Sequence, residues 1–375
     1  MKEVSLYIHI PFCKQKCWYC DFPSFAGKED LMDEYLKALR KEVNNRVKDV
    51  KIKTIFVGGG TPTYLHLEGI LELGNIISGL NTAEDLEFTV EANPGTLTEE
   101  KLKALKDIGV NRISIGLQAV QNNHLKDIGR IHTFNEFKEN FYKARNAGFN
   151  NINVDLMFGL PNQTIKDWEE SLKEISSLEP EHISAYSLII EEGTPFKRYY
   201  EKGILRLPTE EEERTMYNMT LDTLGEKGYT QYEISNFSKT NRECKHNIVY
   251  WDLKEYIGVG SSSSSYINGK RYRNQCSIEK YIDEVNEKSY SFEEVIENSL
   301  EDNMEEFMFM GLRKIDGISI DDFNKRFEND IYSVYGKLID KYKSQGLLIE
   351  EKGRIYLSYK GIEVSNVIMS DFILS

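Results

Sequence analysis

The first half of the chain alternates between two hydrophobic periods. Residues 4–10 alternate strictly, with apolar side chains on one face and Ser5, Tyr7 and His9 on the other, which predicts a strand with one polar face. Similar strand-like runs occupy 54–60, 86–96, 112–118, 151–161 and 182–190. Helical spacing of apolar residues marks 30–47, 98–109, 135–147 and 165–178. Strands that alternate with helices predict βα units and a parallel sheet. Periodicity alone does not decide whether the sheet has six strands or closes fully as an eight-stranded barrel.

The pattern changes after residue 236. Residues 240–275 are rich in polar and aromatic side chains and include GVGSSSSSY (258–266), which we interpret as a packed turn rather than a linker. Helical runs follow at 302–314, 319–327 and 331–345, then a hairpin-like pair, LLIEE and RIYL, and a last helix from about 360. This order predicts a winged-helix-like module. We therefore expect three parts, at 1–236, 237–300 and 301–375.

Composition and charge exclude several classes of protein. No apolar run approaches the ~20 residues of a membrane span, and the N-terminal residues lack the cleavage site of a signal peptide. We therefore expect a cytoplasmic protein. The net charge of −14 argues against a nucleic-acid partner, even though winged-helix modules often bind DNA.

Three of the five cysteines, Cys13, Cys17 and Cys20, fall within eight positions. In a reducing compartment, clustered thiols indicate metal ligands or redox catalysts. A structural zinc site requires four ligands, and His9 could supply the fourth. The spacing C-x3-C-x2-C also suits a 4Fe–4S cluster held at three corners, with one iron left open.

The other unusual residues also follow predicted strands. Gly58 to Pro62 follow the second strand, and Glu91, Gln118 and Asp155 follow the third, fourth and fifth. Parallel folds build their sites at such strand ends.

The cysteine spacing after a first strand, with Tyr19 before the last cysteine and GGGTP at 58–62, resembles the radical S-adenosylmethionine (SAM) superfamily. The resemblance implies an α/β fold, a partial (β/α)6 TIM-like barrel. It also implies a 4Fe–4S cluster on Cys13, Cys17 and Cys20, whose open iron is chelated by SAM and whose electron cleaves SAM to a 5′-deoxyadenosyl radical.

Four further motifs, VEANPGT, RISIGLQ, GRIH and DLMFGLP, are similar in order to the branch containing oxygen-independent coproporphyrinogen III dehydrogenase. This resemblance implies contacts to the cluster-bound SAM from Tyr7, Tyr19, Gly60 and Glu91. It implies contacts to a second SAM-sized ligand from Thr61, Pro62, Gln118, Arg130 and Asp155. Taken singly, Asp155 could instead cap a strand end and Arg130 could form a surface ion pair.

Three features separate the chain from that dehydrogenase. Phe22 stands where the enzyme has an additional cysteine, no N-terminal arm precedes Tyr7, and HNIVYW (246–251) matches the motif of HemW-type heme chaperones, whose resemblance covers essentially the whole chain. The resemblance implies a homodimeric carrier that transfers heme to acceptor hemoproteins, such as membrane-bound respiratory enzymes, without dehydrogenase activity. The alternatives are the dehydrogenase itself and a radical SAM C-methyltransferase.

Within HNIVYW, His246 could ligate heme iron while Tyr250 and Trp251 offer flat apolar faces to the porphyrin. The alternative is that these side chains form hydrogen bonds and pack in the core. Cys244 and Cys276 are further candidates for ligation or covalent attachment. Ser263 and Ser264 stand where relatives usually carry Ala-His, so any role of that histidine is absent.

Overall fold

One open, twelve-stranded sheet forms the centre of the computed structural model, which describes residues 1–374. Its strand order is β12-β11-β10-β9-β1-β2-β3-β4-β5-β6-β8-β7, and β9 and β1 to β6 run parallel. The parallel strands are β1 (Lys2–Ile10), β2 (Val50–Gly59), β3 (Thr82–Ala92), β4 (Arg112–Gln118), β5 (Ile152–Phe158), β6 (His182–Ser187) and β9 (Tyr256–Val259). The antiparallel strands at the two edges are β7 (Thr230–Glu233), β8 (Asn236–Ser238), β10 (Ser264–Ile267), β11 (Lys270–Asn274) and β12 (Phe292–Glu297).

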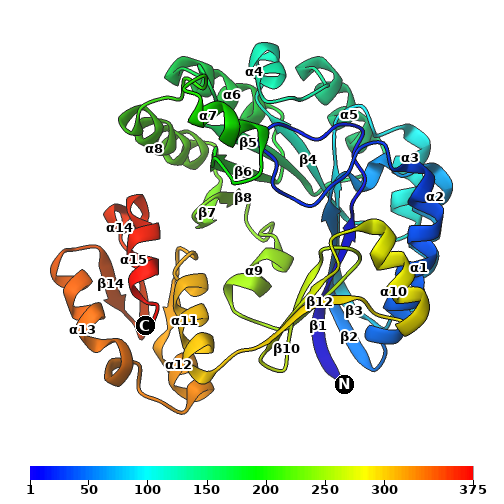
Figure 1. Ribbon diagram of the computed structural model, residues 1–375. Helices are drawn as coiled ribbons and strands as arrows, with labels where there is room; N and C mark the ends of the chain where they lie inside the picture. Colours follow the sequence, from blue (N-terminus) through cyan, green and yellow to red (C-terminus); the bar gives the residue numbers. More distant parts are fainter. Residues whose placement is uncertain (375) are drawn as a thin grey trace.

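The convex side of this sheet is covered by helices (Figure 1). They pack on the apolar face of β1, where Leu6, Ile8 and Ile10 are fully buried, and on its neighbours. The main helices are α1 (Met32–Arg46), α2 (Leu67–Ile77), α3 (Glu99–Asp107), α5 (Phe134–Asn146), α6 (Ile165–Ser177), α8 (Glu210–Glu226) and α10 (Ile278–Lys288). Shorter turns are η1 (Glu29–Leu31), η2 (Pro62–Tyr64), α4 (Asn122–Asp127) and α7 (Pro195–Glu201).

The concave side carries the polar face of β1, as the alternation of residues 4–10 predicts. Strand register sorts its side chains into tiers, because residues in register on parallel strands point to the same side. The lowest tier contains Ser5, Thr54 and Glu87, the middle tier Tyr7, Phe56, Thr89 and Arg112, and the upper tier His9, Gly58, Glu91 and Ser114. Helix α9 (Lys245–Trp251) docks on the lowest tier and contacts both β2 and the C-terminal module (Figure 1).

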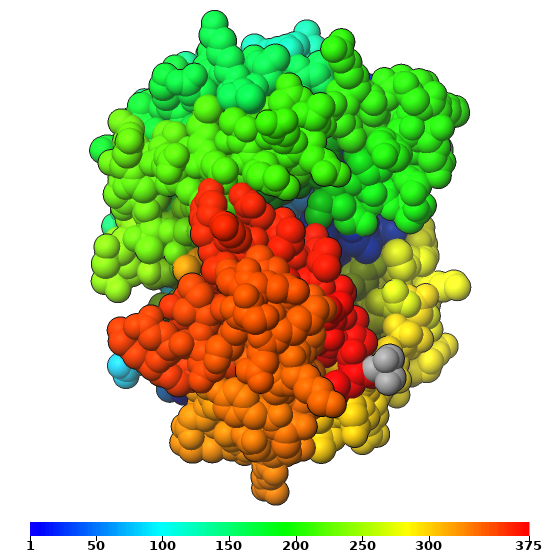
Figure 2. All heavy atoms as spheres, turned by 90° about the vertical axis from the view of Figure 1, so that its left-hand side faces the viewer, coloured from blue at the N-terminus to red at the C-terminus, as the bar shows by residue number. Residues whose placement is uncertain are grey.

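The C-terminal module has its own hydrophobic core and the element order of a winged helix. A three-stranded antiparallel sheet, ordered β13-β15-β14, packs with the helices, and Figure 2 shows this module in orange and red beneath the green part of the core. Its elements are α11 (Leu300–Gly311), β13 (Ile318–Ser319), α12 (Ile320–Phe327), α13 (Ile331–Ser344), β14 (Leu348–Glu351), β15 (Arg354–Leu357), α14 (Tyr359–Glu363) and α15 (Ser365–Asp371).

The predicted fold class is confirmed. The sheet does not close into a barrel: six consecutive strands, β1 to β6, run parallel, and the sheet has open edges at β12 and β7. The serine run is packed, since Ser261, Ser263 and Ser265 are buried, but only its first part is a turn, because β10 begins at Ser264. Helices α2, α8 and α10 were not predicted from the sequence. The division of the chain into three parts at residues 236 and 300 stays a prediction. No helix between residues 1 and 374 combines the length and apolarity needed to cross a bilayer.

Candidate functional site

The three-cysteine loop is held over the carboxyl ends of the parallel strands. Its start and end are tied together, because Cys13 N donates to Phe25 O at 3.0 Å and Phe25 N donates to Pro11 O at 2.8 Å. On the far side Trp18 N donates to Ile128 O at 3.1 Å. These bonds place the thiols above the cavity at the strand ends.

The three thiols form no disulfide and differ in exposure. Cys13 is buried, with its Sγ 3.5 Å from Thr61 Oγ1, while Cys17 and Cys20 are partly exposed. Burial raises the pKa of Cys13, and burial together with the neighbouring Cys17 raises the pKa of Cys20 to about 11. Thiolates at Cys13 and Cys20 are therefore unfavourable without a cation, which an iron–sulfur cluster supplies. The donor set fits such a cluster.

A zinc ion would need a fourth ligand, and His9 is engaged elsewhere. Its Nδ1 lies 3.0 Å from Tyr7 OH and its Nε2 lies 2.8 Å from Pro23 O. Neither ring nitrogen is free for a metal in this conformation, which weakens the zinc alternative.

A small cavity of about 130 Å³ lies beneath the loop. The structure brings together there most of the residues expected to contact SAM: the cavity is lined by Tyr19, Gly60, Glu91, Gln118, Arg130 and Asp155 as well as the three cysteines. Glycine at position 60 is required by packing, since a Cβ there would lie 2.7 Å from Phe12 O. The strand-2 glycines thus let the cysteine loop approach β2.

Two carboxylates face this cavity, Glu91 near the end of β3 and Asp155 within β5, with β4 between the two strands. Glu91 Oε2 accepts a hydrogen bond from Gly59 N at 3.1 Å, and burial with the nearby Asp155 raises the pKa of Glu91 to about 7. Asp155 lies inside β5 rather than after it, and burial raises its pKa although Asn153 and Ser114 donate to it. Such carboxylates suit ribose hydroxyls or an ammonium group.

Arg130 supplies the positive charge of the cavity. Its Nε donates to Gln118 Oε1 at 2.6 Å, and its two terminal nitrogens donate to Asn93 Oδ1 at 2.8 Å and Gly116 O at 2.7 Å. All these acceptors are neutral, so the charge remains available to an anionic group such as the carboxylate of SAM. The expected alternative, a surface ion pair, is not what the structure shows.

A larger cavity of about 530 Å³ adjoins the first and shares Glu91, Ser114 and Asp155 with it. It lies between the concave face of the sheet, α9 and the C-terminal module. Its walls combine aromatic with polar and charged side chains; the aromatic ones include Tyr7, Phe56, Tyr250, Trp251 and Tyr256, and α11 contributes Met310. Tyr7 therefore lines this second cavity and not the one beneath the cysteine loop.

His246 lies at the base of this cavity with both ring nitrogens hydrogen-bonded. Nδ1 lies 2.7 Å from Thr54 Oγ1 and Nε2 lies 2.8 Å from Tyr250 OH. Burial and the nearby Arg112 lower the pKa of His246 to about 3. A role as iron ligand stays a prediction, and it would require the ring to leave both bonds.

The two remaining cysteines are in different surroundings. Cys244 is fully buried before α9, and burial raises its pKa to about 12, whereas Cys276 is exposed. Glu87 fixes the start of α9, because it accepts from Lys245 N and His246 N, each at 3.0 Å.

Two of the expected SAM residues lie beside the small cavity rather than on it. Thr61 accepts a hydrogen bond from Asn93 Nδ2 at 2.7 Å and borders an adjacent pocket, while Pro62 is buried in η2. Sequence reasoning missed Asn93, Tyr186 and Ser114, which line the small cavity. The alternation Arg112, Ser114, Gly116, Gln118 along β4 carried a signal for the third of them.

Comparison with known proteins covers both parts of the chain. Residues 7–175 match the radical SAM superfamily, and residues 298–364 match the HemN C-terminal domain. The chain is similar to heme chaperone HemW of Bacillus subtilis, 41% identical with 98% of this chain and 99% of that protein covered. It is also similar to heme chaperone HemW of Lactococcus lactis, 38% identical with 100% and 98% covered. Coproporphyrinogen III oxidase (HemN) from Escherichia coli shares the fold, with a TM-score of 0.86, 22% identity, and 99% of this chain and 90% of that chain covered.

Proposed function

Because this chain belongs to the HemW family of the radical SAM superfamily, we propose that it is a heme chaperone that binds heme and passes it to acceptor hemoproteins. The observation that carries the proposal is the similarity to HemW proteins along the whole chain. The large aromatic-walled cavity supports it, because a porphyrin requires extended apolar faces. The acceptors are hemoproteins such as respiratory enzymes, the carrier is a homodimer, and the compartment is the cytoplasm.

In this proposal Cys13, Cys17 and Cys20 hold a 4Fe–4S cluster and leave one iron to SAM. SAM on a reduced cluster is a source of radical chemistry. The residues of the chain position it: Tyr19, Gly60 and Glu91 line the same cavity as the thiols. Gln118, Arg130 and Asp155 also line this cavity, and a second SAM-sized ligand would contact them together with Thr61 and Pro62. Arg130 offers that ligand a charge without a carboxylate partner.

Heme lies in the larger cavity in this proposal, against the faces of Tyr250 and Trp251. The Arg313 guanidinium lies 4.6 Å from the ring centre of Trp251 and helps to hold the ring in place. The cavity contacts both the sheet and α11, so movement of the C-terminal module would alter access to heme.

The test uses anaerobically reconstituted protein titrated with hemin. We expect a saturable change in the Soret band, followed by transfer to the apo form of a respiratory hemoprotein faster than passive loss to apomyoglobin. The same protein, supplied with coproporphyrinogen, SAM and a reductant, is expected to make no protoporphyrinogen. Turnover at useful rates would instead support the dehydrogenase, and absence of hemin binding would overturn the chaperone.

A further inference from the structure

Arg112 is a buried cation without a partner. It is the first residue of β4, only 2% of its surface is exposed, and it borders the large cavity. Its Nε has no hydrogen-bond partner among residues 1–374, and none of the described carboxylates approaches its guanidinium to ion-pair distance. A buried guanidinium without an acceptor lowers the stability of the fold unless a ligand supplies the acceptor.

The acidic groups nearest to Arg112 are committed to other donors. Glu87 and Asp155 influence the pKa of Arg112, but Glu87 accepts the N–H groups at the start of α9. Asp155 accepts from Asn153 Nδ2 at 2.7 Å and from Ser114 Oγ at 3.3 Å. These bonds hold both carboxylates in place, and neither forms an ion pair with the guanidinium.

A second unsatisfied donor lies beside the first. Thr89 pairs with Arg112 in register across β3 and β4, so both side chains leave the sheet on the concave side. Thr89 is fully buried, and its Oγ1 also lacks a partner among the described residues. Of the two residues only Arg112 lines the large cavity, so Arg112 is the donor that an acceptor from outside the chain can reach.

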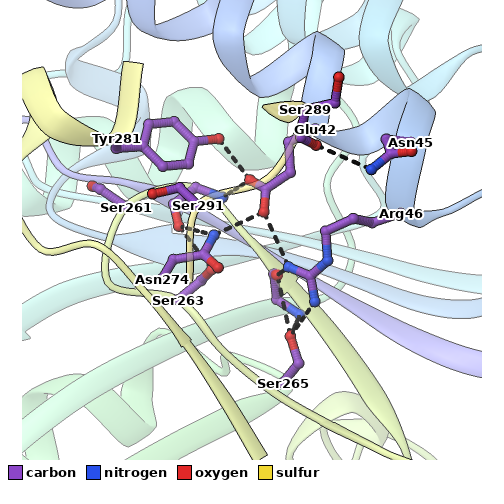
Figure 3. A network of polar contacts seen from close by, with 12 residues as sticks. Glu42, Asn45, Arg46, Ser261, Ser263, Ser265, Asn274, Tyr281, Ser289 and Ser291 are labelled. Carbon is purple, nitrogen blue, oxygen red and sulfur yellow. Dashed lines mark hydrogen bonds and ion pairs between the residues drawn. The ribbon is translucent and has the colours of Figure 1, made fainter. Parts of the chain in front are cut away.

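Glu42, another buried charged residue of this chain, has hydrogen-bond partners for its whole carboxylate. Glu42 accepts from Tyr281 OH at 2.6 Å, Asn274 Nδ2 at 2.8 Å, Gly260 N at 2.9 Å and Arg46 NH1 at 3.0 Å (Figure 3). This network joins α1 to the serine-rich turn and needs no ligand. Arg112 has no comparable set of partners.

We propose that Arg112 binds a carboxylate of the molecule that occupies the large cavity; for heme, a propionate. This inference rests on the proposed function. A guanidinium fork matches a carboxylate in shape and charge, and the aromatic walls suit the apolar ring. Two other cations line the same cavity, but Arg271 is paired with Glu306 and Lys254 with Asp252, so Arg112 is the cation left for an anionic group.

The experiment compares hemin with hemin dimethyl ester, whose propionates carry no charge, on reconstituted full-length protein. We expect the unmodified chain to bind hemin at least about tenfold more tightly than the ester, since a charge-assisted pair is lost. Arg112→Met should abolish most of that difference, and Arg112→Lys should keep part of it. The matched control is Arg145→Met, which removes a partly buried arginine paired with Glu181 outside the cavity, and it should keep the full difference.

The outcomes separate the two claims. Equal affinity of the unmodified chain for hemin and its ester, or a difference that survives in Arg112→Met, would overturn the carboxylate site and leave the chaperone standing. No binding of either compound to the unmodified chain would overturn both. If Arg112→Met fails to fold, the ester comparison on the unmodified chain and Arg112→Lys still decides the matter.

Discussion

The cysteine loop and helix α9 both carry motifs, yet the structure treats their side chains in opposite ways. In the loop, three free thiols border a cavity, and two of them are partly exposed. In α9, His246 is buried with both nitrogens bonded to other side chains. The thiols border a cavity that a ligand can enter, whereas the imidazole of His246 joins α9 to β2 through Thr54. We therefore propose that the loop is a ligand site and that His246 anchors α9.

Removing one thiol should have the largest effect. Cys17→Ala deletes one of the three corners of the proposed cluster, so the visible absorption of the reconstituted protein should be lost and iron should fall from about four atoms per chain to below one. Cys276→Ala, which removes an exposed cysteine, is the matched control and should retain all the iron. If Cys17→Ala kept the full iron and sulfide content, the assignment of the loop as the cluster site would be contradicted.

Replacing His246 should cost stability. His246→Ala leaves Thr54 and Tyr250 without their partner in a buried region, which we expect to lower the free energy of unfolding by roughly 2–4 kcal/mol. Urea unfolding measures this loss. The control is His66→Asn, an exposed histidine whose replacement keeps the N-cap of α2 and should stay within about 0.5 kcal/mol. Unchanged stability together with an altered Soret band would favour an iron ligand instead.

Glu91 should make stability depend on pH in the absence of SAM. Its folded pKa, about 7, lies above the unfolded value of 4.5, so the folded state binds the proton more tightly. Stability is therefore highest below pH 4.5 and falls as the pH rises through 7, by roughly 3 kcal/mol for this group. In Glu91→Gln this slope should be absent, which urea unfolding at several pH values measures. Parallel profiles for the two proteins would contradict the account.

Cys244 should give the smallest effect. It is fully buried and its pKa is raised to about 12, so it behaves as a small apolar side chain. Cys244→Ala should lower stability by about 1 kcal/mol and leave hemin affinity unchanged. Heme that resists extraction under denaturing conditions from the unmodified chain, but not from Cys244→Ala, would show covalent attachment and reverse this assignment.

Local patterns predicted the parts of the site that depend on local geometry. The alternation of residues 4–10 gave the polar face of β1, and the strand ends located Cys13, Gly60, Glu91 and Gln118 around one cavity. The bond of His246 to Thr54 could not be predicted, because Thr54 is 192 residues away and meets it only when α9 docks. Helix α2 was missed because LEGILELGNII contains two glycines, which are unfavourable in helices.

The pairing state of Arg112 was equally invisible in the sequence. An arginine at the start of a strand is ordinarily exposed or paired, and only the three-dimensional placement of Glu87 and Asp155 shows that their oxygens are occupied. The sequence thus indicates which side chains face a site, while the fold determines which of them lack a partner.

Metal analysis of the unmodified chain, purified and reconstituted without oxygen, tests the central claim most directly. If three thiolates hold a cubane with one open iron, we expect about four iron and four sulfide per chain. We also expect the electron paramagnetic resonance signal of the reduced cluster to change when SAM is added. One zinc per chain without sulfide, or a cluster signal that ignores SAM, would contradict the account.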